Sequence, residues 1–242
     1  MVTTQYLFGI IAVLITPFST VPQLYKTWKT KEIKNLSFSA FWILWIGSYL
    51  WILYSLLRNE TSYFSFLASF VDISLISILI FLFYKYTKNK HFIFFTLLLI
   101  ISYLMVILIA ILSFAKILLL NNEIFSSILI NCASFCIAFA SLPQVIKAIY
   151  LKKIKGLSLF YKTLVFFVEV SWFIYWLIAG LLSIYKIEDG IAVTVIEMIQ
   201  LLIWASIAII INGILVCLIL FKEFIPNLKF RKMAKENDIK KN

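Results

Sequence analysis

The sequence predicts an all-α integral membrane protein, with seven transmembrane helices arranged as two parallel three-helix bundles joined by a linker helix (3+1+3). Three observations support this prediction. The chain is 63% hydrophobic and only 14% charged, whereas soluble domains carry about 25% charged residues. Its apolar residues form long runs, and the first part of the chain repeats in the second. A soluble interior could not hide this much apolar surface, so the chain belongs in a bilayer.

The apolar runs define the seven helices in order. A helix of about 17–25 apolar residues crosses the hydrocarbon core of a bilayer. No basic segment precedes the first run, which therefore predicts a spanning helix and not a cleaved signal peptide. The last run is longer than required, so we expect it to tilt or to project past the membrane. The expected spans are 4–25, 39–57, 63–84, 92–115, 125–149, 159–184 and 190–221.

Lysine and arginine predict the orientation of these helices. Cytoplasmic loops of membrane proteins carry an excess of both residues, and here every second loop is basic. Nineteen of the 22 Lys and Arg residues fall on one side of the predicted membrane, and Arg58, Lys116 and Lys186 fall on the other. We therefore expect an outside N-terminus and a cytoplasmic C-terminus. Membrane topology accounts for the net charge of +11 without nucleic acid. The basic loops contain Lys26, Lys29, Lys31 and Lys34; Lys85, Lys88 and Lys90; and Lys147, Lys152, Lys153, Lys155 and, at the loop edge, Lys162.

An internal repeat appears when the chain is shifted by 121 residues. The shift places Pro22-Gln23 on Pro143-Gln144 and preserves a shared spacing over more than thirty residues. Because four helices separate corresponding elements, both copies cross the membrane in the same direction, an arrangement known among transporters. The expected units are 1–86, the first bundle; 87–123, the connector with the fourth helix; 124–221, the second bundle; and 222–242, a basic cytoplasmic tail. Further aligned pairs are Lys26 with Lys147, Leu36-Ser37 with Leu157-Ser158, Trp51 with Trp172 and Tyr54 with Tyr175.

These residues resemble the PQ-loop repeat family, which includes the SWEET sugar transporters and the cystinosin-type amino-acid exporters. Two Pro-Gln pairs stand in register, and a Trp-x-x-Tyr signature begins 28 residues after each Gln. The resemblance covers roughly residues 4–85 and 125–221. It implies a 3+1+3 fold with a solute site between the bundles near the bilayer midplane. It also implies the orientation that the lysines predict.

The Pro-Gln pairs are candidate hinge and gate residues. A proline inside a helix removes a hydrogen-bond donor and clashes with the carbonyl one turn earlier, so Pro22 and Pro143 are expected to kink two helices at matching positions. The alternative is that they only end helices at the interface. Gln23 and Gln144 each donate and accept, and we expect them to bridge to freed carbonyl groups. For them the alternative is exposure to lipid headgroups.

The aromatic signatures are candidate pocket residues. Trp51 and Trp172 offer flat faces with an N–H donor, and the equivalent tryptophan lines the pocket of SWEET-like proteins. Tyr54 and Tyr175 complete the two signatures and are assigned to the same pocket. An interfacial belt is the alternative, since tryptophan is enriched at membrane surfaces.

Three acids are expected deep inside apolar helices. Asp72, Glu169 and Glu197 would each be costly there in ionised form, and groups of this kind usually carry function. Only Glu169 has a cation nearby on its own helix, Lys162, about two turns away. Unpaired carboxyl groups favour their protonated form, so all three are candidates for proton coupling or for binding a substrate charge. Alternatively, they only bond neighbouring helices.

The substrate remains open between sugars and amino acids. With a four-residue insertion, Ser69 aligns with Thr194 and Asp72 with Glu197, and the two hydroxyl residues are assigned to the pocket. SWEET-like proteins typically carry asparagine there, so the alignment argues against sugar. Acids instead suit cationic or zwitterionic solutes.

The sequence thus predicts a transporter of a small polar solute, an amino acid or a sugar, that works by alternating access and is not an enzyme. No Gly-x-x-x-x-Gly-Lys-[Ser/Thr] loop of an ATP-driven pump is present. The first alternative is a peptide-binding receptor resembling the KDEL receptors, which would require basic residues in the cavity. The second is an intramembrane aspartyl protease, but Phe70-Val71-Asp72 lacks the Gly-x-Gly-Asp glycines.

The expected partners are the solute, the lipid bilayer, protons and, as a further candidate, a second copy of the chain. No cofactor, metal or nucleic acid is predicted. Abundant Ile, Lys, Phe and Asn with only six Gly suggest an AT-rich genome and hence a bacterial plasma membrane.

Overall fold

The computed structural model describes residues 2–33, 36–57, 63–117, 123–151, 157–184 and 195–221. All regular elements in these ranges are helices, and seven spans are long and apolar enough to cross a membrane. The predicted all-helical seven-span architecture is confirmed, and the protein is an integral membrane protein. The helices are α1 (Val2–Thr30), α2 (Phe38–Leu57), α3 (Tyr63–Thr87), α4 (Phe92–Phe114), α5 (Glu123–Phe139), α6 (Leu142–Leu151), α7 (Leu159–Ile184) and α8 (Val195–Ile219).

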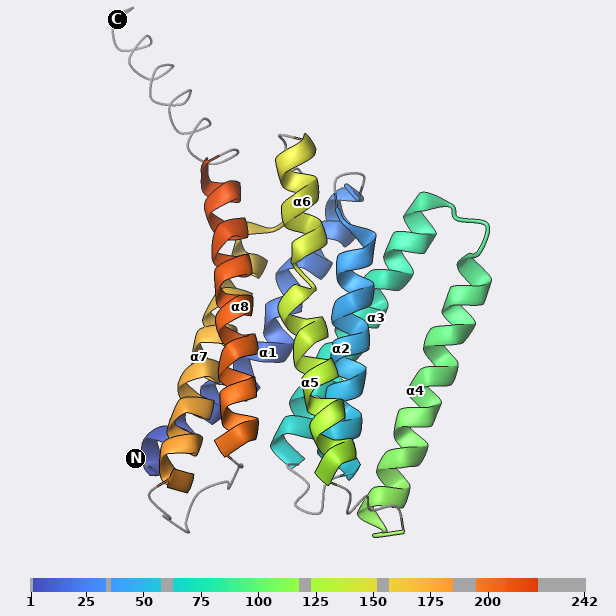
Figure 1. Ribbon diagram of the computed structural model, residues 1–242. Helices are drawn as coiled ribbons and strands as arrows, with labels where there is room; N and C mark the ends of the chain where they lie inside the picture. The colour runs from blue at the N-terminus through green and yellow to red at the C-terminus, as the bar shows by residue number, and fades with distance from the viewer. Residues whose placement is uncertain are drawn as a thin grey trace, which may run out of the picture.

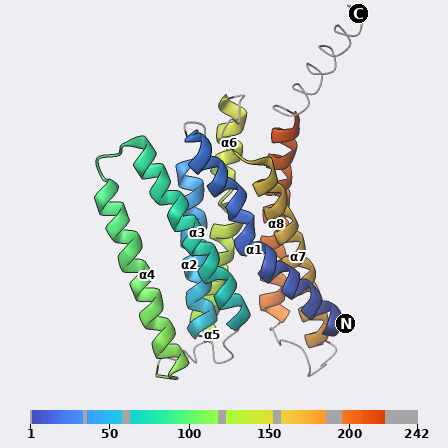
Figure 2. The same ribbon diagram turned by 180° about the vertical axis from the view of Figure 1, so that it is seen from behind.

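The helices pack as two similar groups of three with α4 apart (Figures 1 and 2). The helix α3 packs against both α1 and α2, and α8 packs in the same way against α7 and α5. Contacts between the groups run from α1 to α7 and from α2 to α5. We call α1–α3 the first bundle and α5–α8 the second bundle. This packing supports the predicted division into repeats.

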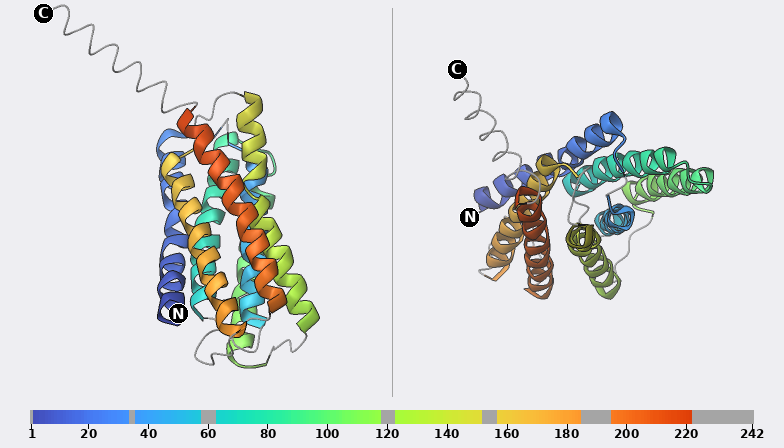
Figure 3. Two further views of the ribbon diagram at one scale, coloured as in Figure 1. Left: turned by 60° about the vertical axis from the view of Figure 1, so that its left-hand side comes forward. Right: turned by 90° about the horizontal axis from the view of Figure 1, so that it is seen from above.

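Helix α4 lies at the periphery and contacts only α2 and α3 among its principal neighbours (Figure 3). Its most apolar window has a mean hydropathy of 3.0, and only 11% of that window is buried. Such a surface suits contact with lipid tails. Polar bonds to both neighbours secure it: the Ser113 hydroxyl donates to the carbonyl of Leu56 on α2, and the hydroxyl groups of Tyr103 and of Ser74 on α3 share a hydrogen bond.

The fifth span is interrupted, which differs from the single helix expected over 125–149. The helix α5 ends at Phe139 and α6 begins at Leu142. Pro143 explains the interruption, because it has no N–H to donate to the carbonyl of Phe139 and is tolerated in the first turn of a helix. The matching Pro22 leaves α1 continuous through Thr30. Pro143 thus coincides with a break between two helices, whereas Pro22 lies within a continuous helix. The expected kinks at matching positions stay a prediction.

Close approach between the bundles depends on Gly47 of α2. A Cβ atom at this position would lie 2.9 Å from Ile137 Cγ1 and 3.0 Å from Cys136 Cβ, both on α5. Small residues allow helix backbones to approach in this way. Gly47 thus brings α2 against α5 at the boundary between the bundles.

The short connection between α1 and α2 reverses the chain at one end of the molecule. Lys31 has a φ of 55°, and its N–H donates to the Thr27 carbonyl at 2.9 Å. A left-handed residue of this kind commonly ends a helix. We call this end, where α1 ends, α2 and α7 begin and α6 lies, the α6 end (Figure 1).

Candidate functional site

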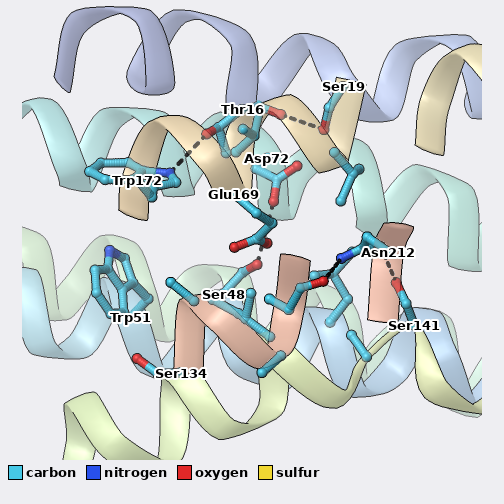
Figure 4. A pocket seen from close by; sticks show the side chains of 18 of the residues that line it. Thr16, Ser19, Ser48, Trp51, Asp72, Ser134, Ser141, Glu169, Trp172 and Asn212 are labelled. Carbon is cyan, nitrogen blue, oxygen red and sulfur yellow. Dashed lines mark hydrogen bonds between the residues drawn. The ribbon is translucent and has the colours of Figure 1, made fainter. Parts of the chain in front are cut away.

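A polar cavity of about 130 Å³ lies between the two bundles and is lined by α1, α2 and α3 on one side and by α5, α7 and α8 on the other. Figure 4 shows its polar side chains converging from both bundles. Among the residues predicted for the site, Trp51, Ser69, Asp72, Glu169 and Trp172 line it. The cavity therefore unites residues that are more than 100 positions apart in the chain.

Asp72 projects from α3 into this cavity and is 8% exposed. Two hydroxyl groups from its own bundle donate to the carboxylate, Thr20 at 3.0 Å and Ser48 at 3.4 Å. Within the described chain, no Lys or Arg forms an ion pair with it. The carboxylate therefore depends on neutral donors, which makes its ionised form costly in an apolar interior.

The second bundle contains a similar arrangement around Asn212 of α8. The Ser141 hydroxyl donates to Asn212 Oδ1 at 2.7 Å, just as Thr20 donates to Asp72. Thr20 and Ser141 are equivalent in the repeat, because each precedes its Pro-Gln proline by two residues. By these contacts Asn212, and not Glu197, is the counterpart of Asp72.

Lys162, which the sequence analysis placed at a loop edge, lies buried in the first turn of α7. The side chain lies on α7, is 5% exposed and lines the cavity. Its Nζ donates to Ser141 Oγ at 2.7 Å and to Asn212 Oδ1 at 3.4 Å, and lies 4.6 Å from the centre of the Tyr161 ring. The cavity therefore contains a basic side chain as well as the acids Asp72 and Glu169.

Glu169 lies seven residues beyond Lys162 on the same helix and also lines the cavity. Seven residues are about two turns, or about 10 Å of helix, so both side chains share one face of α7. They act on each other electrostatically, but they form no ion pair in the described structure. This spacing was the signal in the sequence that could have placed Lys162 inside.

Trp51 and Trp172 face each other across the cavity, as Figure 4 shows. Each is the fourteenth residue of its helix, so the repeat places them at equal depth. Trp172 Nε1 donates to Thr16 Oγ1 of α1 at 3.4 Å. Trp176, which the sequence analysis did not single out, stacks on Trp172 at 6.0 Å and meets Trp51 edge-on at 6.3 Å. These rings form an apolar wall that includes side chains of both bundles.

Three other residues predicted for the site, Tyr54, Tyr175 and Glu197, do not line the cavity. Tyr54 and Tyr175 are buried. Tyr54 packs among apolar residues that include Ile130. Glu197 lies in the first turn of α8 and not deep within this helix. There an acid complements the helix dipole. Thr194 lies outside the described residues.

At the α6 end, the first Pro-Gln motif bonds to the opposite bundle. The side-chain carbonyl of Gln23 accepts a hydrogen bond from the Ser158 N–H at 2.8 Å. Lys26 Nζ donates to the carbonyl of Leu157 at 2.8 Å. Gln23 is fully buried, so it is not exposed to lipid headgroups. The motif of α1 thereby holds the two residues that precede α7.

The second motif makes the same contacts in the reverse direction. The side-chain carbonyl of Gln144 accepts from the Ser37 N–H, and Lys147 Nζ donates to the carbonyl of Leu36. The motif after α5 thus holds the two residues that precede α2. We call these two equivalent sets the crossed bonds. The sequence analysis expected Gln23 and Gln144 to bridge to freed carbonyl groups. Here their side-chain carbonyls accept hydrogen bonds from backbone N–H groups of the opposite bundle.

Two polar residues outside the cavity join helices within the second bundle. Asn131 Nδ2 donates to Gln200 Oε1 at 2.8 Å, and Trp204 Nε1 donates to Asn131 Oδ1 at 3.1 Å. In the described residues, no group of three or more His, Cys, Asp or Glu side chains could hold a metal ion.

Known proteins resemble this chain in sequence and in fold. The PQ loop repeat family matches residues 5–64. The sugar transporter SemiSWEET of Leptospira biflexa is 29% identical over 87 residues, which cover 36% of this chain and 98% of that protein. An uncharacterized protein of Methanocaldococcus jannaschii is 38% identical over 52 residues, 22% of this chain and about half (56%) of the relative.

The fold has a solved counterpart. A eukaryotic SWEET transporter superimposes with a TM-score of 0.58 over 91% of this chain and 97% of its own, at 10% sequence identity. At this identity the likeness concerns the fold alone. The sequence matches and the seven-span architecture agree with the paired Pro-Gln motifs: residues 5–64 match the PQ loop repeat family, and the chain has a SWEET-like fold.

Proposed function

We propose that this protein carries a small polar solute across a membrane by alternating access between its two bundles. The observation that carries the proposal is the pair of crossed bonds beside a polar cavity. These bonds join one bundle to the other, so they can break while the hydrogen bonds inside each bundle persist. Their loss would open the cavity at the α6 end. The named transport function of SemiSWEET supports the same conclusion.

The size of the cavity favours a small solute. Its volume of about 130 Å³ holds a few water molecules at about 30 Å³ each and lies below the roughly 300–1,000 Å³ typical of sites for drug-sized ligands. A disaccharide would not fit without a large rearrangement. The lysine-rich loops favour a cytoplasmic location for the α6 end, and the composition favours a bacterial plasma membrane.

Asp72 is the group that we assign to proton coupling. Its carboxylate is buried with two neutral donors, Thr20 and Ser48, and an ionised acid in that setting is costly. When the cavity opens to water, the ionised form is solvated and its cost falls. The alternation of access would therefore bind and release a proton together with the solute.

A receptor is the second candidate function, and Lys162 is the observation that favours it. A basic side chain within the cavity could hold the carboxylate at the end of a peptide. Its acidic neighbours and the volume of the cavity argue against this function, because a peptide tail needs a longer groove.

Uptake into proteoliposomes tests these proposals. The panel contains glucose, sucrose, cystine, arginine, lysine, histidine and leucine, each with and without an inward proton gradient. Uptake of one solute above that of empty vesicles is expected. If the folded, reconstituted protein transports none of them, the transport function is contradicted.

Asp72→Asn tests the coupling, and Glu32→Gln is its control, since Glu32 is an exposed acid outside the predicted membrane. The first variant should lose the dependence of uptake on the gradient, and the second should keep it. Uptake that ignores the gradient in the wild-type protein would show that Asp72 does not couple transport to protons.

A further inference from the structure

In the part of the chain that the structure describes, the buried side chain of Lys162 has no anionic partner at contact distance. In the described part of the chain, its hydrogen-bond partners are two neutral oxygens, from Ser141 and Asn212. A buried ammonium group is costly unless an anion neutralises it. An ammonium group has three N–H donors, so these two bonds leave one donor for a ligand. A carboxylate fits this position by charge and by hydrogen bonding.

Glu169 presents the opposite charge on the same wall of the cavity. No side chain of the described residues donates a hydrogen bond to its carboxylate, and Lys162 acts on it electrostatically without forming an ion pair. The two charged side chains rise from one face of α7 about two turns apart. Both line the cavity.

The apolar wall lies beyond the charged pair. Trp51, Trp172 and Trp176 form it, and aromatic faces bind aliphatic groups well. A neutral sugar would leave both charges unpaired, whereas a solute with two opposite charges and an apolar side chain would match all three features.

We propose that the cavity binds a zwitterion, a free amino acid with an apolar side chain, whose carboxylate contacts Lys162 and whose ammonium group contacts Glu169. Ser141 and Asn212 position the lysine. This inference rests on the proposed function, because it assigns a substrate class to the same transport site.

Calorimetric binding to the purified full-length protein tests this assignment. The probes are leucine, leucinamide, which lacks the carboxylate, isocaproate, which lacks the ammonium group, and glucose. Leucine should bind about tenfold or more tightly than either analogue, because a charge-assisted hydrogen bond is lost with each.

Matched variants then identify the residues. Lys162→Met should abolish the preference for leucine over leucinamide, whereas Lys162→Arg, which keeps the charge, should retain it. Glu169→Gln should abolish the preference for leucine over isocaproate. If Lys162 only stabilised the contact of α7 with its neighbours, Lys162→Met would lower the melting temperature but leave the ratio of leucine to leucinamide affinity unchanged, and the assignment would be overturned.

The results also separate this inference from the proposed function. Binding of glucose without binding of leucine overturns the zwitterion assignment. Uptake of glucose into proteoliposomes would still agree with the proposed transport function. Absence of uptake for every solute contradicts the transporter itself.

Discussion

Gln144→Leu should shift the protein toward a conformation that is open at the α6 end. Ser37 is 7% exposed, and its N–H donates to the Gln144 side chain across the bundle boundary. Leucine is close in size but cannot accept this bond. A buried donor without a partner costs about 1–3 kcal/mol. In the open conformation water satisfies the same N–H, so the cost falls on the closed conformation alone.

The expected population change follows from this cost. A free-energy difference of about 1–3 kcal/mol changes the ratio of open to closed molecules roughly 5- to 150-fold. Gln23→Leu should act similarly, because Gln23 accepts from the Ser158 N–H in the equivalent set. In each variant, the free-energy change between the open and closed conformations should be larger than the change in the free energy of unfolding of the bundle that carries the substitution.

Spin-label distance measurements can detect the shift. Labels at exposed Lys29 and Tyr150 report on the two bundles at the α6 end, in a background where the three cysteines are replaced. The Gln144→Leu variant should populate longer distances than the wild-type protein. Gln200→Leu is the matched control, because Gln200 bonds to Asn131 within one bundle. Identical distance distributions in all three proteins, or equal shifts in both variants, would refute the assignment of the crossed bonds as a gate.

Two further substitutions test the packing and the aromatic wall. Gly47→Ala should lower the free energy of unfolding by about 1–3 kcal/mol, because its Cβ would lie 2.9 Å from a side-chain atom of α5, whereas Gly213→Ala meets its nearest neighbour at 3.4 Å and should be tolerated. Denaturation in detergent measures both, and equal losses would contradict the packing argument. Trp172→Ala should weaken solute affinity roughly two- to tenfold, and Trp28→Ala, at a position 62% exposed, should leave it unchanged. Concentration-dependent uptake measures both, and equal affinity in the two variants would exclude Trp172 from the site.

Much of the architecture could be predicted from the sequence, because membrane spans depend on local composition. Every expected span overlaps an observed membrane-length segment. The repeat likewise placed Trp51 and Trp172 at equal positions, and both line the cavity. Apolar composition does not determine where a helix begins, so the sequence alone did not place Glu197 in the first turn of α8.

The contacts that define the site were decided only by the tertiary structure. Lys162 resembles a loop lysine because it lies near the start of an apolar run. Its burial depends on Ser141 and Asn212, which come from other parts of the chain. The crossed bonds could not be read from the motifs either, since Gln23 meets Ser158, 135 residues away. Hydropathy and charge determine which segments enter the bilayer, because the transfer of a segment into lipid depends on the composition of that segment. Which side chains meet one another depends on how the two bundles dock.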